Sequence, residues 1–384
     1  MMKKILVILT GGTICAVADD NGENRTNAAT VRSYLTEHFK KKSHSPYRDK
    51  VEFLSEALSP DILSENMTPA AWGEIIEIIK DEGTSADISG IIILHGTDTL
   101  AYTAAFLSLA LAGIKIPVML VSAQLPLLKR ESGALIPDGR SNGYANFRMA
   151  VDLIMGGVAP NVYVPYRNEK GEGDGRHRAG KMLVHYGAHL TQCKNGTNNF
   201  ESRSEMRPRG IFKPRLNGAR PFGSEGCLFE KIDEPSSTVL YIKPYTGLDY
   251  SRIMTDGVSA VVHGTYHSES VCIGRARPER RAPLGASENY ALSDITGDDR
   301  PYSILGLISA CKEDNIPVFL APCDGANYSY GTTGNALRRG AVPLPDITVE
   351  AAYAKAVLGS SIGLSGGELV EFMKKPINGE MREA

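Results

Sequence analysis

The stretch ILVILTGGTI, residues 5–14, determines the fold class of this chain. Its first half is a short, continuous apolar run, which is typical of a parallel strand buried on both faces. Its second half is a turn built on two glycines and a threonine. A second stretch, IIILHGTDT at residues 91–99, repeats the same order. Because ligands of open α/β sheets bind beyond the carboxyl ends of the strands, we expect the two turns to form one site.

Further strands and helices alternate along the chain. Thr68 followed by Pro69 predicts the start of a helix, since threonine caps helices and proline suits their first position. The remaining apolar runs predict strands at residues 117–121, 162–164, 238–242, 259–262 and 317–320, and helices at residues 142–155, 301–311 and 348–358.

The chain is long enough for two domains with separate cores. Between the elements predicted up to residue 164 and those predicted from residue 238 onwards, the composition becomes rich in polar residues, glycine and proline, without sustained periodicity. We therefore predict a larger N-terminal α/β domain with a mostly parallel sheet (residues 1–205), a linker (206–236) and a smaller C-terminal α/β domain (237–384).

Composition narrows the class of protein. The chain is 42% hydrophobic and 22% charged with a net charge of −2, so we expect a globular protein that does not bind nucleic acid. No apolar run approaches the ~18 residues that a membrane span needs, and we expect a cytoplasmic protein. Six cysteines lie far apart without a C-x-x-C pair, so we expect neither a zinc site nor a disulfide framework.

The two turns carry residue types that suit nucleophilic chemistry. Gly12 lets the backbone approach a ligand closely, and Thr13 then presents a hydroxyl to the crevice, although a capped tight turn would have the same sequence. Thr97 and Asp98 bring a second hydroxyl and a carboxylate. Asp98 either caps the helix that follows or binds the ammonium group of an amino-acid substrate. His95 is expected to be structural.

A threonine nucleophile also needs a base within hydrogen-bond reach. A lysine in a dry site can take this role, because burial favours its neutral form. Lys181 is the candidate by spacing. It lies in a glycine-rich, basic segment, where a solvent-exposed lysine is the alternative interpretation.

Taken together, the motifs TGGTI and HGTDT resemble those of the bacterial-type asparaginase/glutaminase family. The segments SENMTP (64–69), SAQ (122–124) and DITVEA (346–351) extend the similarity over nearly the whole chain, and it is greatest to the cytosolic, type I branch. The resemblance implies an asparaginase-like two-domain fold and a homodimer or homotetramer.

The resemblance also implies an activity and a site. L-asparagine would be hydrolysed to L-aspartate and ammonia through an acyl-enzyme, without cofactor or metal. Thr13 would be the nucleophile, supported by Thr97, Asp98 and Lys181. Ser64 and Asp98 would hold the α-carboxylate and α-ammonium groups of the substrate. The residues implied to line the substrate site are Gly12, Ser64, Glu65, Gly96 and Ala123.

The chain also departs from the family pattern. The lid segment after Thr13 lacks the expected tyrosine, with none before Tyr34, and Glu65 adds negative charge beside the ammonium pocket. Residues 264–268, GTYHS, replace a pattern that ordinarily ends in Gly-Asn. Two alternatives therefore stay open: an amidase of the same fold with another amide substrate, and a weakly active relative that binds an amino acid. An amidotransferase component for charged tRNA would need an added RNA-binding portion.

Overall fold

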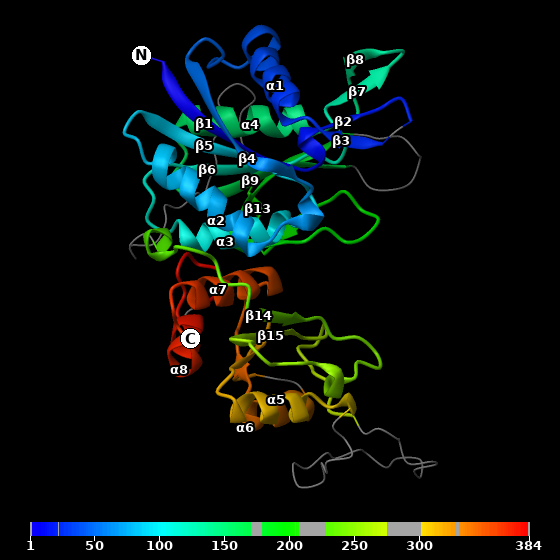
Figure 1. Ribbon diagram of the computed structural model, residues 1–384, viewed down its shortest axis with the longest axis vertical. Coiled ribbons are helices and arrows are strands. Elements are labelled where there is room, and N and C mark those ends of the chain that lie inside the picture. Colours follow the sequence, from blue (N-terminus) through cyan, green and yellow to red (C-terminus); the bar gives the residue numbers. More distant parts are fainter. Residues whose placement is uncertain are drawn as a thin grey trace. The chain divides into compact units, whose positions relative to one another are not determined.

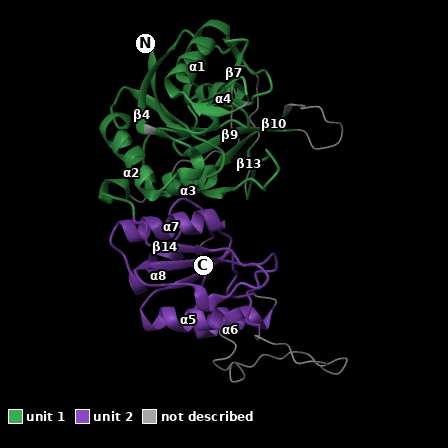
Figure 2. Cartoon of the chain, turned by 45° about the vertical axis from the view of Figure 1, so that its right-hand side comes forward, with its two compact units in different colours: residues 1–235 green, residues 236–384 purple. Residues whose placement is uncertain are grey.

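The computed structural model describes residues 2–21, 23–169, 179–203, 205–206, 228–274, 301–327 and 330–382. The chain divides into two compact units, residues 1–235 and 236–384 (Figure 2). The division falls at the end of the segment predicted as a linker, of which residues 207–227 lie outside the described residues.

A seven-stranded sheet with the order β13-β10-β9-β6-β5-β1-β4 forms the centre of unit 1 (Figure 1). The strands from β4 to β9 in this order are parallel, and β10 and β13 extend the sheet with antiparallel pairs. The bounds are β1 Lys3–Gly11, β4 Val51–Ile62, β5 Ile88–Leu94, β6 Val118–Val121, β9 Val162–Glu169, β10 Ala179–Tyr186 and β13 Glu205–Met206. The mostly parallel sheet predicted from the apolar runs is confirmed.

Helices cover both faces of this sheet (Figure 1). On one face, α1 (Ala28–Lys42) and α4 (Gly143–Gly156) pack Phe39 and Phe147 against strand residues such as Val7 and Ile92. On the other face lie α2 (Pro69–Ile78) and α3 (Leu100–Ala110). The predicted start of α2 is confirmed, since the Thr68 side chain accepts a hydrogen bond from the backbone N–H of Ala71.

The strand order reverses direction at β1. The chain passes from β1 to β4 on one side of it and then to β5 on the other side. Such a switch point leaves a crevice between the loops that leave the two neighbouring strands, and ligands of open α/β sheets bind there. The turns at Thr13 and Thr97 follow β1 and β5, so the topology places both at this crevice.

A second sheet, with the order β3-β2-β7-β8, joins two hairpins of unit 1. Strands β2 (Ala16–Ala18) and β3 (Asn24–Thr26) form the segment directly after Thr13, and β7 (Leu128–Glu131) and β8 (Ala134–Pro137) follow β6. β2 pairs with β7 in parallel, with Val17 opposite Leu128. The predicted lid segment is therefore part of a sheet. The smaller elements of unit 1 are β11 (Leu190–Thr191), β12 (Glu201–Ser202), and short turns of helix at Thr13–Cys15, Ser64–Asn66, Ile79–Gly83, Gly187–His189 and Leu228–Lys231.

Unit 2 has a parallel sheet with the order β14-β15-β16-β17. Its strands are β14 Val239–Ile242, β15 Ala260–Gly264, β16 Val318–Ala321 and β17 Val342–Pro343. Its helices are α5 Ile304–Glu313, α6 Gly331–Arg339, α7 Val349–Ser361 and α8 Gly366–Lys374, with a short turn at Tyr250–Arg252. Its core includes Val261, Ile308 and Leu320. The second α/β domain is therefore present, as the sequence predicts.

Candidate active site

The turns after β1 and β5 touch through their glycines. Gly12 has φ 72°, and a Cβ atom added to it would lie 2.4 Å from the Cα atom of Gly96. Gly11 has φ 111°, and its Cβ would lie 2.2 Å from the carbonyl oxygen of Ile62 at the end of β4. No other residue fits where two backbones come this close at a positive φ. The pair of glycines is therefore the reason that the two threonine turns can meet.

Ser64 joins a third turn to the same place. Its side chain is buried, and a Cβ atom added to Gly96 would lie 2.3 Å from the Ser64 Oγ. The Ser64 hydroxyl donates to Asp98 Oδ2 at 3.3 Å and accepts from the Asp98 backbone N–H at 3.3 Å. The Thr99 hydroxyl donates to the Ser64 carbonyl oxygen at 2.7 Å. Ser64 and Asp98, which the resemblance assigns to the same substrate, are thus direct neighbours.

These contacts bear on one of the two roles considered for Asp98, that of a helix cap. The N-cap of α3 is Thr99, and the Asp98 carboxylate instead accepts from Ser64. The interpretation of Asp98 as a helix cap is therefore wrong. The carboxylate is exposed, so it is available to a cation from solvent.

Two hydroxyls of the crevice have no partner among the residues that the structure describes, whereas a third has one. Thr13 and Thr97 are half-buried, and neither hydroxyl has a hydrogen bond to any residue that the structure describes. By contrast, Thr10 is buried, and its hydroxyl donates to the Leu94 carbonyl oxygen at 2.9 Å. The hydroxyl of Thr10 stabilises the pairing of β1 with β5, and those of Thr13 and Thr97 remain able to contact a ligand.

Lys181 lies on β10, three strands away from β5 in the sheet order. Its side chain is exposed, and within the described part of the chain no hydrogen bond or ion pair joins it to Thr97 or Asp98. The structure thus brings the turns that carry Thr13, Ser64 and Thr97–Asp98 together, and it shows no contact of Lys181 with them among the described residues. Its catalytic role stays a prediction.

The other residues predicted to line the site differ in exposure. Glu65 is exposed in the short turn Ser64–Asn66. Ala123 follows β6 and is fully buried. Its neighbour Gln124 has a side chain that donates to Glu169 Oε1 at 2.8 Å.

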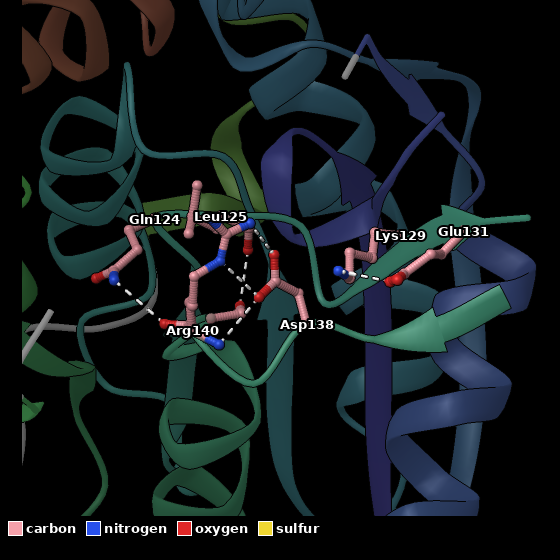
Figure 3. A network of polar contacts seen from close by, with 7 residues as sticks. Gln124, Leu125, Lys129, Glu131, Asp138 and Arg140 are labelled. Atoms are coloured by element: carbon pink, nitrogen blue, oxygen red, sulfur yellow. Dashed lines mark hydrogen bonds and ion pairs between the residues drawn. The ribbon is translucent and has the colours of Figure 1, made fainter. Parts of the chain in front are cut away.

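The loop from Gln124 to Asn142 carries the hairpin β7–β8, and polar contacts close its base (Figure 3). Arg140 donates to both carboxylate oxygens of Asp138, at 3.0 and 2.6 Å, and Gln124 Nε2 donates to the Arg140 carbonyl oxygen at 3.4 Å. The Ser141 hydroxyl donates to the Leu125 carbonyl oxygen at 2.7 Å. Because β7 pairs with β2, this braced hairpin fixes one side of the segment that follows Thr13.

His95 lies at the end of β5, fully buried, with Nδ1 2.8 Å from the Gly96 carbonyl oxygen. Burial lowers the pKa of His95 to about 4, so the ring is neutral at pH 7. These contacts agree with the structural role predicted for it.

Gln192 is the residue of this site that the sequence did not indicate. It contacts the backbone of the Thr97 turn from a loop that follows β11, and no local pattern marks it. Among the residues that the structure describes, no group of three or more His, Cys, Asp or Glu side chains could hold a metal ion. Nor does any helix within the described ranges have the length and apolarity to cross a membrane.

The fold and the site define an α/β protein whose sheet switch point carries threonine hydroxyls beside a serine–aspartate pair. The sequence profile "Asparaginase, N-terminal" matches residues 4–189, which include all of these residues. The chain belongs to the asparaginase family, a family of amidohydrolases.

Several relatives extend the similarity. L-asparaginase 1 of Escherichia coli (strain K12) is 26% identical over 99% of this chain and 98% of its own length. A glutamyl-tRNA(Gln) amidotransferase subunit of Methanopyrus kandleri is 34% identical over 41% of this chain, a match that spans 32% of the length of that relative. The crystal structure of L-asparaginase I from Vibrio cholerae matches with a TM-score of 0.68 and 22% identity, covering both chains completely. At that identity, the match shows a shared fold.

Proposed function

We propose that the protein hydrolyses the side-chain amide of L-asparagine to L-aspartate and ammonia, with Thr13 as the nucleophile. One observation carries the proposal: the hydroxyl of Thr13, which has no hydrogen-bond partner among the described residues, lies on a turn that touches the turn of Thr97 and Asp98 at the switch point of the sheet. Family membership and the nearly full-length similarity to an L-asparaginase support it.

The reaction has two halves. The Thr13 oxygen attacks the amide carbon, the C–N bond breaks, and the nitrogen leaves as ammonia with the proton that the hydroxyl gives up. Water then attacks the resulting ester, releases aspartate and returns a proton to Thr13. A threonine hydroxyl needs a base for the first half. Thr97 on the touching turn and the amine of Lys181 are the groups proposed to relay that proton.

Ser64 and Asp98 are proposed to bind the α-carboxylate and the α-ammonium group. The Asp98 carboxylate is exposed and can only accept hydrogen bonds, which suits an ammonium group. The Ser64 hydroxyl donates to Asp98 at 3.3 Å, which is long for a hydrogen bond between oxygens. Replacing that bond by one to a substrate carboxylate therefore loses little.

The test is ammonia release by the purified protein from a panel of amides that differ by one group. Asparagine is compared with glutamine, with succinamic acid, which lacks the α-ammonium, and with 3-aminopropanamide, which lacks the α-carboxylate. We expect kcat/KM to be at least about 100-fold higher for asparagine than for the two truncated amides, since each loses a charged contact. Equal rates for all amides would contradict the proposed roles of Ser64 and Asp98.

The same panel separates the alternatives. Preference for an amide other than asparagine would indicate an amidase with another substrate, for which Glu65 beside the ammonium pocket is the supporting feature. Tight binding of aspartate or asparagine in calorimetry without turnover would indicate an amino-acid-binding relative. A strong preference for glutamine would favour a role like that named for the archaeal amidotransferase subunits. The predictions of a homodimer or homotetramer and of a cytoplasmic location are kept as part of the proposal.

A further inference from the structure

The turn that carries Thr97 and Asp98 is held by a side chain 95 residues further along the chain. Gln192 Nε2 donates to the carbonyl oxygen of Thr97 at 2.7 Å, and Gln192 Oε1 accepts from the backbone N–H of Ala101 at 3.3 Å. One amide group thus bridges the turn and the first turn of α3. Gln192 is partly buried and directly follows β11, whose Thr191 pairs with Glu201 of β12.

Helix α3 needs such a partner because its own N-cap side chain does not serve it. The first N–H groups of a helix have no acceptor within the helix. The N-cap residue is Thr99, which makes no capping hydrogen bond, because its hydroxyl donates to the Ser64 carbonyl oxygen instead. Gln192 supplies the missing acceptor from a distant part of the chain.

Ser64 and Gln192 support different parts of this turn, beside the contact of His95 with the Gly96 carbonyl oxygen. Ser64 contacts the backbone and the carboxylate of Asp98, and Gln192 contacts the carbonyl group of Thr97. A threonine has few allowed χ1 rotamers, so fixing its backbone largely fixes the direction of its hydroxyl. The Thr97 carbonyl oxygen accepts from Gln192 at 2.7 Å and from the Leu100 backbone N–H at 3.4 Å, so Gln192 makes the shorter of the two contacts that hold the backbone of Thr97.

We propose that Gln192 is a positioning residue that aims Thr97 into the active site. The inference rests on the proposed function, in which Thr97 assists Thr13. It concerns kcat more than KM, because Asp98, which is proposed to bind the substrate, is held separately by Ser64.

Two substitutions separate positioning from stability. Gln192→Met removes both hydrogen bonds at nearly constant size. Gln192→Glu keeps an acceptor for the Ala101 N–H and places a negative charge at the start of α3, which is a favourable position for an anion. The same carboxylate places an oxygen next to the Thr97 carbonyl oxygen and has no N–H group to donate to it. We therefore expect Gln192→Glu to keep a higher melting temperature than Gln192→Met and still to lose activity.

The experiment measures kcat and KM for asparagine, the melting temperature, and hydrogen–deuterium exchange of the peptide that contains residues 96–101. Both variants are expected to lose about tenfold in kcat, the factor that corresponds to ~1.4 kcal/mol, with KM within about threefold of the wild type. Exchange is expected to rise in Gln192→Met. Thr191→Val is the matched control, because it removes the hydrogen bond from the Thr191 hydroxyl to the Glu201 carbonyl oxygen on the same strand without touching the turn.

A wild-type kcat in Gln192→Glu overturns the inference, as does an equal loss of kcat in Thr191→Val. An inactive wild-type protein would contradict the proposed function instead, and exchange would then decide on the support of the turn. Faster exchange in Gln192→Met would show that the Gln192 contacts support the turn. Unchanged exchange would refute that support.

Discussion

Polar side chains of the two units differ in how completely they are paired, and the difference separates structural from reactive groups. In unit 2, Lys355 and Glu380 are fully buried and form an ion pair of 2.7 Å. Glu380 also accepts the backbone N–H groups of Ile377 and Asn378. In unit 1, the hydroxyls of Thr13 and Thr97 are half-buried and have no partner among the described residues. We conclude that a fully paired buried group contributes to stability, whereas an accessible group without a partner can contact substrate.

The largest effect is expected from Thr13→Val, compared with Thr10→Val on the same strand end. Removing the nucleophile should lower kcat by about 1,000-fold or more and leave the melting temperature unchanged, since the hydroxyl has no partner among the described residues. Thr10→Val should cost ~1 kcal/mol of stability and keep kcat within about threefold, because it removes only the hydrogen bond to Leu94. Ammonia release measures kcat of both variants, and thermal unfolding measures their stability. Full activity in Thr13→Val would refute the assignment of the nucleophile.

The comparison of the two threonines also shows how far the sequence alone could lead. Strands β1 and β5 are predictable because a buried parallel strand needs a continuous apolar run. That their turns meet follows from a general rule about sheet ends. By contrast, strand β4 (Val51–Ile62) mixes polar and apolar residues at the sheet edge, and its pairing with β1 defines it.

Contacts from distant loops could not be predicted in the same way. Gln192 acts on the Thr97 turn through an amide whose partners are backbone atoms, and neither partner leaves a pattern in the sequence. Spacing along the chain selected Lys181 as the candidate base, but spacing does not place its side chain relative to Thr97, so this role stays a prediction. In the structure, β9 and β6 lie between β10 and β5.

The second largest effect is expected at the paired site of unit 2. Lys355→Met leaves the buried Glu380 carboxylate without its cation and should cost about 3–5 kcal/mol of stability. The double variant Lys355→Met/Glu380→Gln should be less destabilised than the single one, because no uncompensated charge is buried. Urea unfolding followed by circular dichroism measures both. If the double variant is the less stable of the two, the ion pair is not the reason for the loss.

A smaller effect concerns the buried histidines His95, His185 and His263. Burial lowers the pKa of each to about 4, against about 6.5 in an unfolded chain. Between these values the unfolded state binds more protons than the folded state. Stability is therefore present in full above about pH 6.5 and is lost as the pH falls towards 4, by of the order of 1–3 kcal/mol for each histidine.

Melting temperatures recorded from pH 7 down to pH 4.5 test this slope. His185→Gln should flatten it, because the amide can keep the hydrogen bond to Ser202 and does not titrate. The exposed His44 is the control, and His44→Gln should leave the profile unchanged. The explanation fails if both substitutions flatten the slope equally.

The smallest effects are expected in the hairpin β7–β8, where two ion pairs differ in burial (Figure 3). The Asp138 side chain is 8% exposed and accepts from the backbone N–H and two guanidinium nitrogens of Arg140, which hold its pKa below the usual value. Asp138→Asn should cost ~1 kcal/mol, since it weakens several charge-assisted hydrogen bonds at once. Lys129 and Glu131 are 36% and 58% exposed and share a single contact. Lys129→Met should change stability by less than about 0.5 kcal/mol, because solvent screens an exposed pair. Urea unfolding of the two variants decides this, and equal losses would mean that pairing and burial do not set the contribution of a polar contact in this hairpin.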